Sequence, residues 1–107
     1  MRFEIVLAPQ AAQALRALPA RHRAEVRDAL ETHLRHEPTK VSKSRIKRLR
    51  GMRQPEYRLR IGEIRVFYDV GNETVEVLAI VTKAQAQAWL EEKGASDPDR
   101  GTGEGER

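Results

Sequence analysis

The chain has 107 residues, enough for a single domain with one hydrophobic core. It contains no cysteine, which excludes disulfide frameworks and thiolate metal sites. Its 20 basic and 16 acidic residues give a formal net charge of +4. No apolar run is long enough for a membrane span or for the core of a signal peptide, so we expect a cytoplasmic protein with no membrane contact.

The N-terminal third predicts one strand and two helices. Residues 2–7 (RFEIVL) alternate partly and are rich in β-forming side chains, which favours a strand. Apolar side chains recur at helical spacing between Pro9, which suits a first helical turn, and Pro19, which ends the run. A second helix is predicted over 20–36 and ends before Pro38. Two helices separated by little more than a proline form a helical hairpin.

A polar connection follows over residues 39–54 and begins the most basic part of the sequence. The window from residue 40 to residue 65 holds ten basic residues against two acidic ones, so it carries +8 while the rest of the chain carries −4. Such a block is typical of proteins with a polyanionic partner, although a solvated surface loop has the same composition.

The second half predicts three strands and a last helix. Three β-rich runs are separated by short turns, and consecutive strands with short turns form an antiparallel meander. Thr82 is a suitable N-cap for a helix over about 83–93, which ends at Gly94. The strands are predicted over 57–61, 64–70 and 74–81.

The element order β-α-α-β-β-β-α predicts an α+β fold in two layers. We expect the helical hairpin to pack on a small, mostly antiparallel four-stranded sheet, followed by a C-terminal helix, within one domain over residues 1–93. Residues 94–107 contain almost no apolar side chain, so we expect a disordered polar tail there.

The two-residue turn Gly62-Glu63 fixes the pairing of the strands on either side, because glycine at the first position is typical of a type II′ hairpin. Arg60 then faces Arg65, and Arg58 faces Phe67. Side chains alternate across a sheet. One face is therefore predicted to be apolar and to form the core, with Tyr57, Leu59, Ile61, Ile64, Val66, Tyr68 and Val70. The opposite face carries Arg58, Arg60, Arg65 and Phe67.

Two arginines directly opposite one another destabilise a hairpin by about 0.2–1 kcal/mol. We expect this repulsion to be relieved by a carboxylate on the next strand, for which Glu76 is the candidate, by an acidic partner, or by nucleic-acid phosphate. Guanidinium groups bind phosphates bidentately and stack on bases, so this face suits an RNA strand. Phe67 either offers a stacking surface to a base or packs under the last helix.

Histidines are the remaining candidates for site chemistry. His33 and His36 lie three residues apart on the second helix, but no third ligand accompanies them, so we expect no metal site. They belong to the helical layer, away from the arginines, and we therefore assign them no acid–base role.

Three segments together resemble the RelE/ParE superfamily of toxins from type II toxin–antitoxin systems, and more closely its RelE branch. They are LRGM at 49–52, YRLRIGEIRVFYDV at 57–70 and VEVLAIVTK at 75–83. The resemblance extends over residues 2 to about 92. It implies a toxin that is neutralised by a cognate acidic antitoxin and that contacts operator DNA only through this antitoxin.

For the RelE branch, the resemblance implies an endoribonuclease that cleaves messenger RNA in the ribosomal A site and so inhibits translation. A ribose 2′-hydroxyl attacks the neighbouring phosphate without a metal or any other cofactor, while cationic side chains stabilise the developing charge. The ribosome with its bound messenger RNA is then the partner. Dense Lys and Arg give affinity for RNA backbone, so we expect RNA contacts from Lys40, Lys43, Arg45, Lys47, Arg48, Arg50 and Arg53.

The resemblance also implies roles for individual residues. Arg58 and Arg60 match the two basic positions of the catalytic strand, and Arg65 matches an arginine of the next strand that stabilises phosphate. RelE proteins carry a further arginine after the last strand and a tyrosine near the C-terminal helix. Here Lys83 is the candidate to replace the arginine, and Trp89 to replace the tyrosine, although a lone tryptophan on a helix also serves as a packing anchor.

Two other functions stay open because of these departures. One is a ParE-like protein that poisons DNA gyrase by binding and cleaves no RNA. The other is a catalytically weak homologue that acts mainly by binding its antitoxin.

Overall fold

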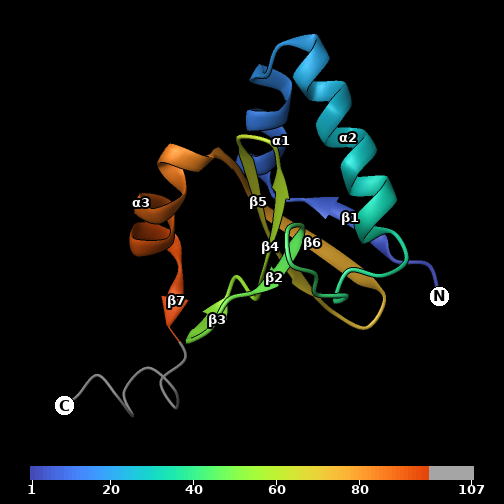
Figure 1. Cartoon of the computed structure of the whole chain (residues 1–107), viewed down its shortest axis with the longest axis vertical. Helices are drawn as coiled ribbons and strands as arrows, with labels where there is room; N and C mark the ends of the chain where they lie inside the picture. Colours follow the sequence, from blue (N-terminus) through green and yellow to red (C-terminus); the bar gives the residue numbers. More distant parts are fainter. Residues whose placement is uncertain (97–107) are drawn as a thin grey trace.

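The computed structural model describes residues 1–96, and its elements follow the predicted order (Figure 1). Three short strands are added to those expected. The elements are β1 (Glu4–Leu7), α1 (Pro9–Ala17), α2 (Ala20–Leu34), β2 (Ile46–Arg48), β3 (Met52–Gln54), β4 (Tyr57–Ile61), β5 (Ile64–Val70), β6 (Thr74–Thr82), α3 (Lys83–Lys93) and β7 (Ala95–Ser96).

The main sheet has five strands in the order β1-β6-β5-β4-β2. The predicted meander is confirmed, since β4, β5 and β6 pair antiparallel, and β1 pairs parallel with β6. The prediction of four strands is wrong because β2 pairs with β4 inside the segment expected to be a connection. Only Ile46 of β2 is buried, and its other two residues are charged, which suits a strand at the edge of a sheet. The sequence of this segment therefore shows too little alternation of apolar and polar residues to predict a strand.

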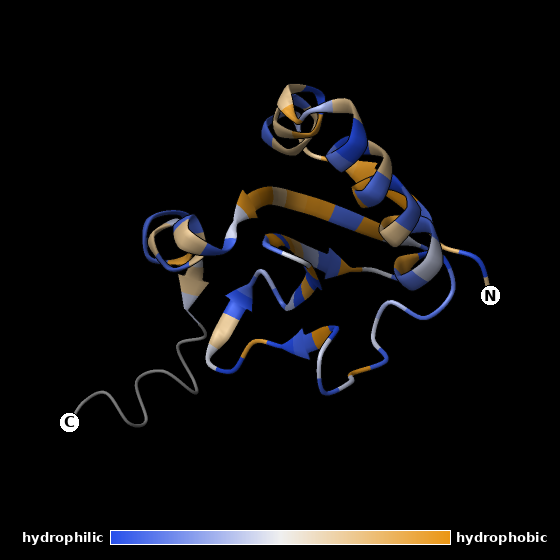
Figure 2. Ribbon diagram, turned by 45° about the horizontal axis from the view of Figure 1, so that its top comes forward, coloured by the Kyte–Doolittle hydropathy of each residue, from blue (hydrophilic) through white to orange (hydrophobic). Residues whose placement is uncertain are grey.

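The helical hairpin covers one face of the main sheet, as predicted, and the core lies between these two layers. In Figure 2 the apolar ribbon of β6 passes beneath the hairpin and ends at α3. Burial of these side chains is the main stabilising contribution to the fold. The helices contribute Ala11, Leu15, Val26, Leu30 and Leu34, and the sheet contributes residues that include Leu59, Val66, Val75 and Val77.

A second, two-stranded sheet joins β3 to β7. Ala95 and Ser96 therefore form a strand, and the prediction of a disordered tail is wrong for these two residues because β3 offers them a pairing partner that local composition does not show. The rest of the predicted tail, residues 97–107, lies outside the described residues. No helix within residues 1–96 is long and apolar enough to cross a membrane.

Gly94 connects α3 to β7 where another chain segment approaches closely. A Cβ atom at this position would lie 2.5 Å from Met52 Cε and 2.6 Å from the Leu90 carbonyl oxygen. We therefore expect Gly94→Ala to lower the free energy of unfolding by about 1–3 kcal/mol, measured by urea denaturation. Gly71→Ala is the matched control, since its Cβ would meet only the Thr74 oxygen at 3.7 Å. Equal effects of the two substitutions would contradict this account of Gly94.

Tyr68 anchors the segment that follows α2. Its ring is fully buried, and its hydroxyl donates a hydrogen bond of 2.6 Å to the carbonyl oxygen of Pro38, which is also buried. Burial raises the pKa of the Tyr68 hydroxyl, so it remains a donor at any physiological pH.

Tyr68→Phe would leave the Pro38 carbonyl without a partner. We expect this substitution to lower the free energy of unfolding by roughly 1–3 kcal/mol in thermal or urea denaturation. Tyr57→Phe is the control, because the Tyr57 ring stacks on Tyr68 at a centroid distance of 5.5 Å and the substitution preserves that stack. A Tyr68→Phe protein as stable as the Tyr57→Phe protein would show that the hydrogen bond contributes nothing.

Candidate nucleic-acid interface

The β4–β5 hairpin has the register that the two-residue turn predicts. Arg60 lies opposite Arg65, and Arg58 lies opposite Phe67. Gly62 in the turn has φ 58°, a conformation that L side chains rarely adopt. Because Leu59 and Val66 point into the core beneath the hairpin helices, the alternation of side chains places the three arginines on the other face of the sheet.

Strand β2 adds a further cation to this face. Lys47 lies opposite Arg58 in the β2–β4 register, so the two side chains share a face. Two rows result, one with Lys47, Arg58 and Phe67 and one with Arg60 and Arg65. We call Lys47, Arg58, Arg60 and Arg65 the cationic sheet face.

Arg58 lies at the centre of the cationic sheet face and has an unsatisfied donor. Its Nε is buried and has no hydrogen-bond partner within the described part of the chain. The pKa of Arg58 is lowered, first by burial and then by the positive charges of Arg65 and Arg60. A buried donor without a partner costs free energy, which an anion bound at this face would recover.

Arg65 is more buried than expected, with 7% of its surface exposed. Its Nη1 donates to the carbonyl oxygens of Gly62 at 2.8 Å and Ile64 at 3.1 Å. The guanidinium therefore braces the β4–β5 turn, and part of its donor capacity is used within the protein.

Glu76 does not relieve the repulsion between Arg60 and Arg65, so that expectation is wrong. In the β5–β6 register Arg65 lies opposite Val81, whereas Glu76 lies opposite Asp69 near the other end of β5. The ion pairs among residues 1–96 are Arg35–Glu31, Lys40–Glu37 and His22–Glu25. None of them involves the cationic sheet face, so no carboxylate in this part of the chain neutralises it.

Phe67 and Trp89 pack on each other rather than standing free. Their rings stack with a centroid distance of 5.2 Å and an angle of 14° between their planes. Phe67 is 1% exposed, so the expectation that it offers a stacking surface to RNA is wrong. Trp89 is half-buried and fastens α3 to the sheet, because the other residues of this helix bury little.

Lys83 begins α3 at the edge of the cationic sheet face. Its backbone N–H donates to the Glu63 carbonyl oxygen at 2.7 Å, which brings the start of the helix to the turn that Arg65 braces. The predicted N-cap is confirmed, since the Thr82 hydroxyl accepts from the Gln85 backbone N–H in a capping box. The side chain of Lys83 is exposed.

The predicted RNA-binding residues of the connection are all exposed, but they do not form one surface. Lys47 belongs to the cationic sheet face, whereas the Arg48 guanidinium lies over the Tyr57 ring, 5.3 Å from its centroid. Lys40 and Arg45 line a separate pocket beside α2. An open groove of about 460 Å³ separates the β2–β3 segment from α3 and is lined by residues that include Lys47, Arg50, Leu49, Met52, Gln87 and Leu90.

Sequence reasoning did not identify four of these groove residues, Leu49, Met52, Gln87 and Leu90, as site residues. They come from the β2–β3 segment and from α3, which are distant in sequence, and nothing in the local pattern brings them together. Within residues 1–96, no group of three His, Asp or Glu side chains is placed to hold a metal ion.

The fold, a small α+β domain with a helical hairpin on one face of a mostly antiparallel sheet, matches solved structures of RelE-like toxins. The toxin in the RelBE2 toxin–antitoxin complex from Mycobacterium tuberculosis aligns with a TM-score of 0.60 and 25% identity, covering 77% of this chain and 99% of that one. The archaeal RelE–RelB complex from Pyrococcus horikoshii aligns with a TM-score of 0.59 and 28% identity, covering 79% of this chain and 99% of that one. The YoeB dimer from Staphylococcus aureus shares the fold. It aligns with a TM-score of 0.61 and 16% identity, covering 76% of this chain and 97% of that one.

A family model described as the ParE toxin of the type II toxin–antitoxin system parDE matches residues 5–87. This match spans most of the chain, so the protein belongs to the ParE toxin family, within the RelE/ParE superfamily that its sequence resembles. No curated protein sequence matches the chain significantly.

The arrangement of the cationic sheet face predicts that repulsion between its charges lowers the stability of the fold. Replacing Arg60 by glutamine removes the charge opposite Arg65, so we expect Arg60→Gln to raise the free energy of unfolding by about 0.2–1 kcal/mol in low salt. Arg21→Gln, at an exposed position in the first turn of α2, serves as the control. An Arg60→Gln protein that is less stable than the parent would show that the repulsion is already relieved inside the protein.

Proposed function

We propose that this toxin is a ribosome-dependent endoribonuclease that cleaves messenger RNA in the A site and thereby stops translation in the cytoplasm. The observation that carries the proposal is the cationic sheet face, which has no internal counter-charge and contains a buried Arg58 Nε without a partner. Phosphate of an RNA strand is an anion that satisfies both features.

In the proposed reaction, the ribose 2′-oxygen forms a bond to the adjacent phosphorus while the bond to the 5′-oxygen breaks. The proton of the 2′-hydroxyl passes to water, the leaving 5′-oxygen takes a proton from water, and a 2′,3′-cyclic phosphate and a free 5′-hydroxyl remain. Arg58 and Arg60 bind the phosphate and stabilise the negative charge of the transition state, and Lys83 supplies a further cation at the rim. Arg65 positions the hairpin through its bonds to the turn carbonyls.

The composition of this face supports the proposal that cleavage depends on the ribosome. Lysine and arginine are poor general bases at neutral pH because they stay protonated. Catalysis by Lys47, Arg58 and Arg60 must therefore come from charge stabilisation, and the strand has to arrive already oriented for in-line attack. A ribosome that holds the messenger RNA in the A site supplies this orientation, and the exposed basic residues of the connection bind ribosomal RNA backbone.

The test uses purified toxin, ribosomes programmed with a defined messenger RNA, and primer extension to map cuts. We expect cuts within the A-site codon, and Arg58→Gln or Arg60→Gln should slow cleavage by about 100-fold or more. Arg21→Gln, which leaves the sheet face intact, should cut like the parent protein. Unchanged cleavage by a folded Arg60→Gln protein would contradict the assignment of the site.

A cognate acidic antitoxin is the proposed protein partner. The relatives from Mycobacterium tuberculosis and Pyrococcus horikoshii were solved as toxin–antitoxin complexes. Acidic side chains of such a partner would neutralise the cationic sheet face in the same way as phosphate, so binding of antitoxin and RNA at this face would be mutually exclusive. Operator DNA is reached through the antitoxin.

One observation favours a second function, a gyrase poison. The matching family model is that of ParE toxins, and α3 lacks the arginine and tyrosine of the RelE pattern. If this is the activity, programmed ribosomes stay uncut and the toxin traps gyrase–DNA cleavage complexes that appear as linear plasmid after denaturation. A protein that does neither but binds its antitoxin would be a catalytically weak homologue.

A further inference from the structure

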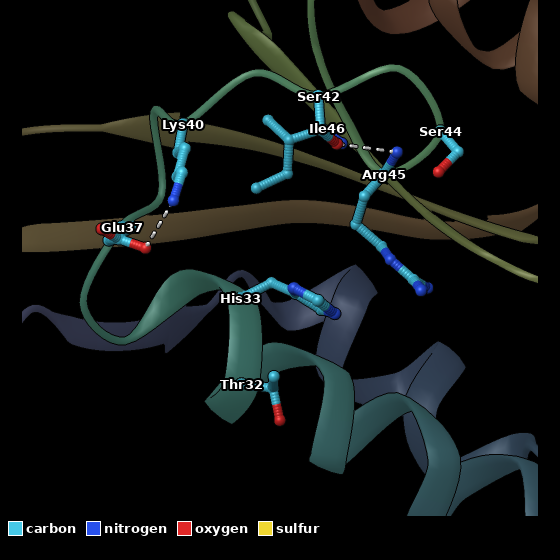
Figure 3. A pocket seen from close by; sticks show the side chains of 8 residues that line it. All are labelled: Thr32, His33, Glu37, Lys40, Ser42, Ser44, Arg45 and Ile46. Carbon is cyan, nitrogen blue, oxygen red and sulfur yellow. Dashed lines mark hydrogen bonds and ion pairs between the residues drawn. The ribbon is translucent and has the colours of Figure 1, made fainter.

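A second cationic pocket lies at the C-terminal end of α2, apart from the cationic sheet face (Figure 3). Its volume is about 340 Å³, and it is enclosed by the last turn of α2 and the segment that leads into β2. Ile46, which is buried on the helical side of the sheet, forms its apolar wall. The polar residues that line it are Thr32, His33, Glu37, Lys40, Ser42, Ser44 and Arg45.

The chain around this pocket is held in place at both ends. The Ser42 Oγ accepts from the backbone N–H groups of Arg45 at 3.1 Å and Ile46 at 3.3 Å, and the Ser42 N–H donates to the Ile46 carbonyl oxygen at 2.9 Å. At the other end, Pro38 is tied to the buried Tyr68 hydroxyl. The pocket is therefore a fixed feature of the fold, and its position depends on the core.

Arg45 and His33 line this pocket from two different segments of the chain, and the one carboxylate that lines it, Glu37, pairs with Lys40 at 3.6 Å. In Figure 3 the Arg45 side chain extends toward α2, the helix that carries His33. His33 lies in the last turn of α2, where the helix dipole favours a cation. Its pKa is nevertheless lowered, first by burial and then by the charge of Arg45, so a negative group beside the imidazole would favour its protonated form.

We propose that this pocket binds a phosphate group between the Arg45 guanidinium and the protonated His33 imidazole. The hydroxyl group of Ser44, which also lines the pocket, adds a neutral donor at its rim. Phosphate fits better than a single carboxylate because it offers oxygens in several directions to donors of different elements. The exposed Lys43 adds a further cation to the same segment, which suits the repeated charge of a nucleic-acid backbone.

The site is coupled to the protonation of His33. The titratable groups around this imidazole are Arg45, Lys40 and Glu37, and only Glu37 carries a negative charge. A bound phosphate adds negative charge beside the imidazole and raises the pKa of His33, so by linkage the protonated pocket binds phosphate more tightly. Affinity therefore increases as the pH falls through the lowered pKa of His33.

The experiment follows the imidazole of His33 by NMR across a pH series, in chloride buffer alone, with inorganic phosphate, and with a short single-stranded RNA. We expect both ligands to raise the pKa of His33, and Arg45→Gln to weaken binding at least about tenfold. A shift with RNA alone identifies the backbone as the ligand, and a shift with inorganic phosphate alone identifies a free phosphate site.

Two matched variants make the outcome decisive. Arg21→Gln, at the opposite end of α2, should leave the response of His33 unchanged. Arg60→Gln should also leave it unchanged, which separates this pocket from the ribonuclease proposal because that variant removes the sheet-face function. No response of His33 to either ligand, or an undiminished response in Arg45→Gln, would overturn the proposal.

Discussion

The two-residue turn between β4 and β5 is the constraint on which the rest of the structure depends. Gly62 adopts φ 58°, and nothing lies within 4 Å of the position that a Cβ would take, so the need for glycine comes from the backbone conformation and not from crowding. With this turn in place, the pairing of two strands is fixed to the residue. A shift of one residue would turn the arginines into the core and the apolar side chains into solvent.

The same register concentrates positive charge that the fold does not neutralise. Arg58, Arg60 and Arg65 repel one another, and the structure responds by directing the Arg65 guanidinium to the turn carbonyls while the Arg58 Nε stays without a partner. Stability alone would favour a carboxylate or an apolar residue here. A negatively charged partner that binds the folded chain at this face would recover the cost.

Packing of α3 determines how much of that face is open. The helix is joined to the sheet through the stack of Trp89 on Phe67, through the Lys83 contact with the β4–β5 turn, and through Gly94 and the β3–β7 pair. These contacts are few: they involve the two ends of the helix and one aromatic pair. The helix α3 therefore lies beside the cationic sheet face and contributes little to the core. The groove beside it is a consequence of this arrangement.

Local sequence determined much of this protein. Period-two alternation, proline positions and the Gly62 turn were enough to predict the helical hairpin, the meander, the N-cap at Thr82 and the face shared by the three arginines, because each depends on neighbours in the chain. Tertiary structure alone decided the pairing of β2 and of β7, the bulge in β6, the burial of Phe67, and the pocket that His33 and Arg45 line together. These features join segments far apart in sequence, and the contact energies that fix them exist only once the sheet and the helices have packed.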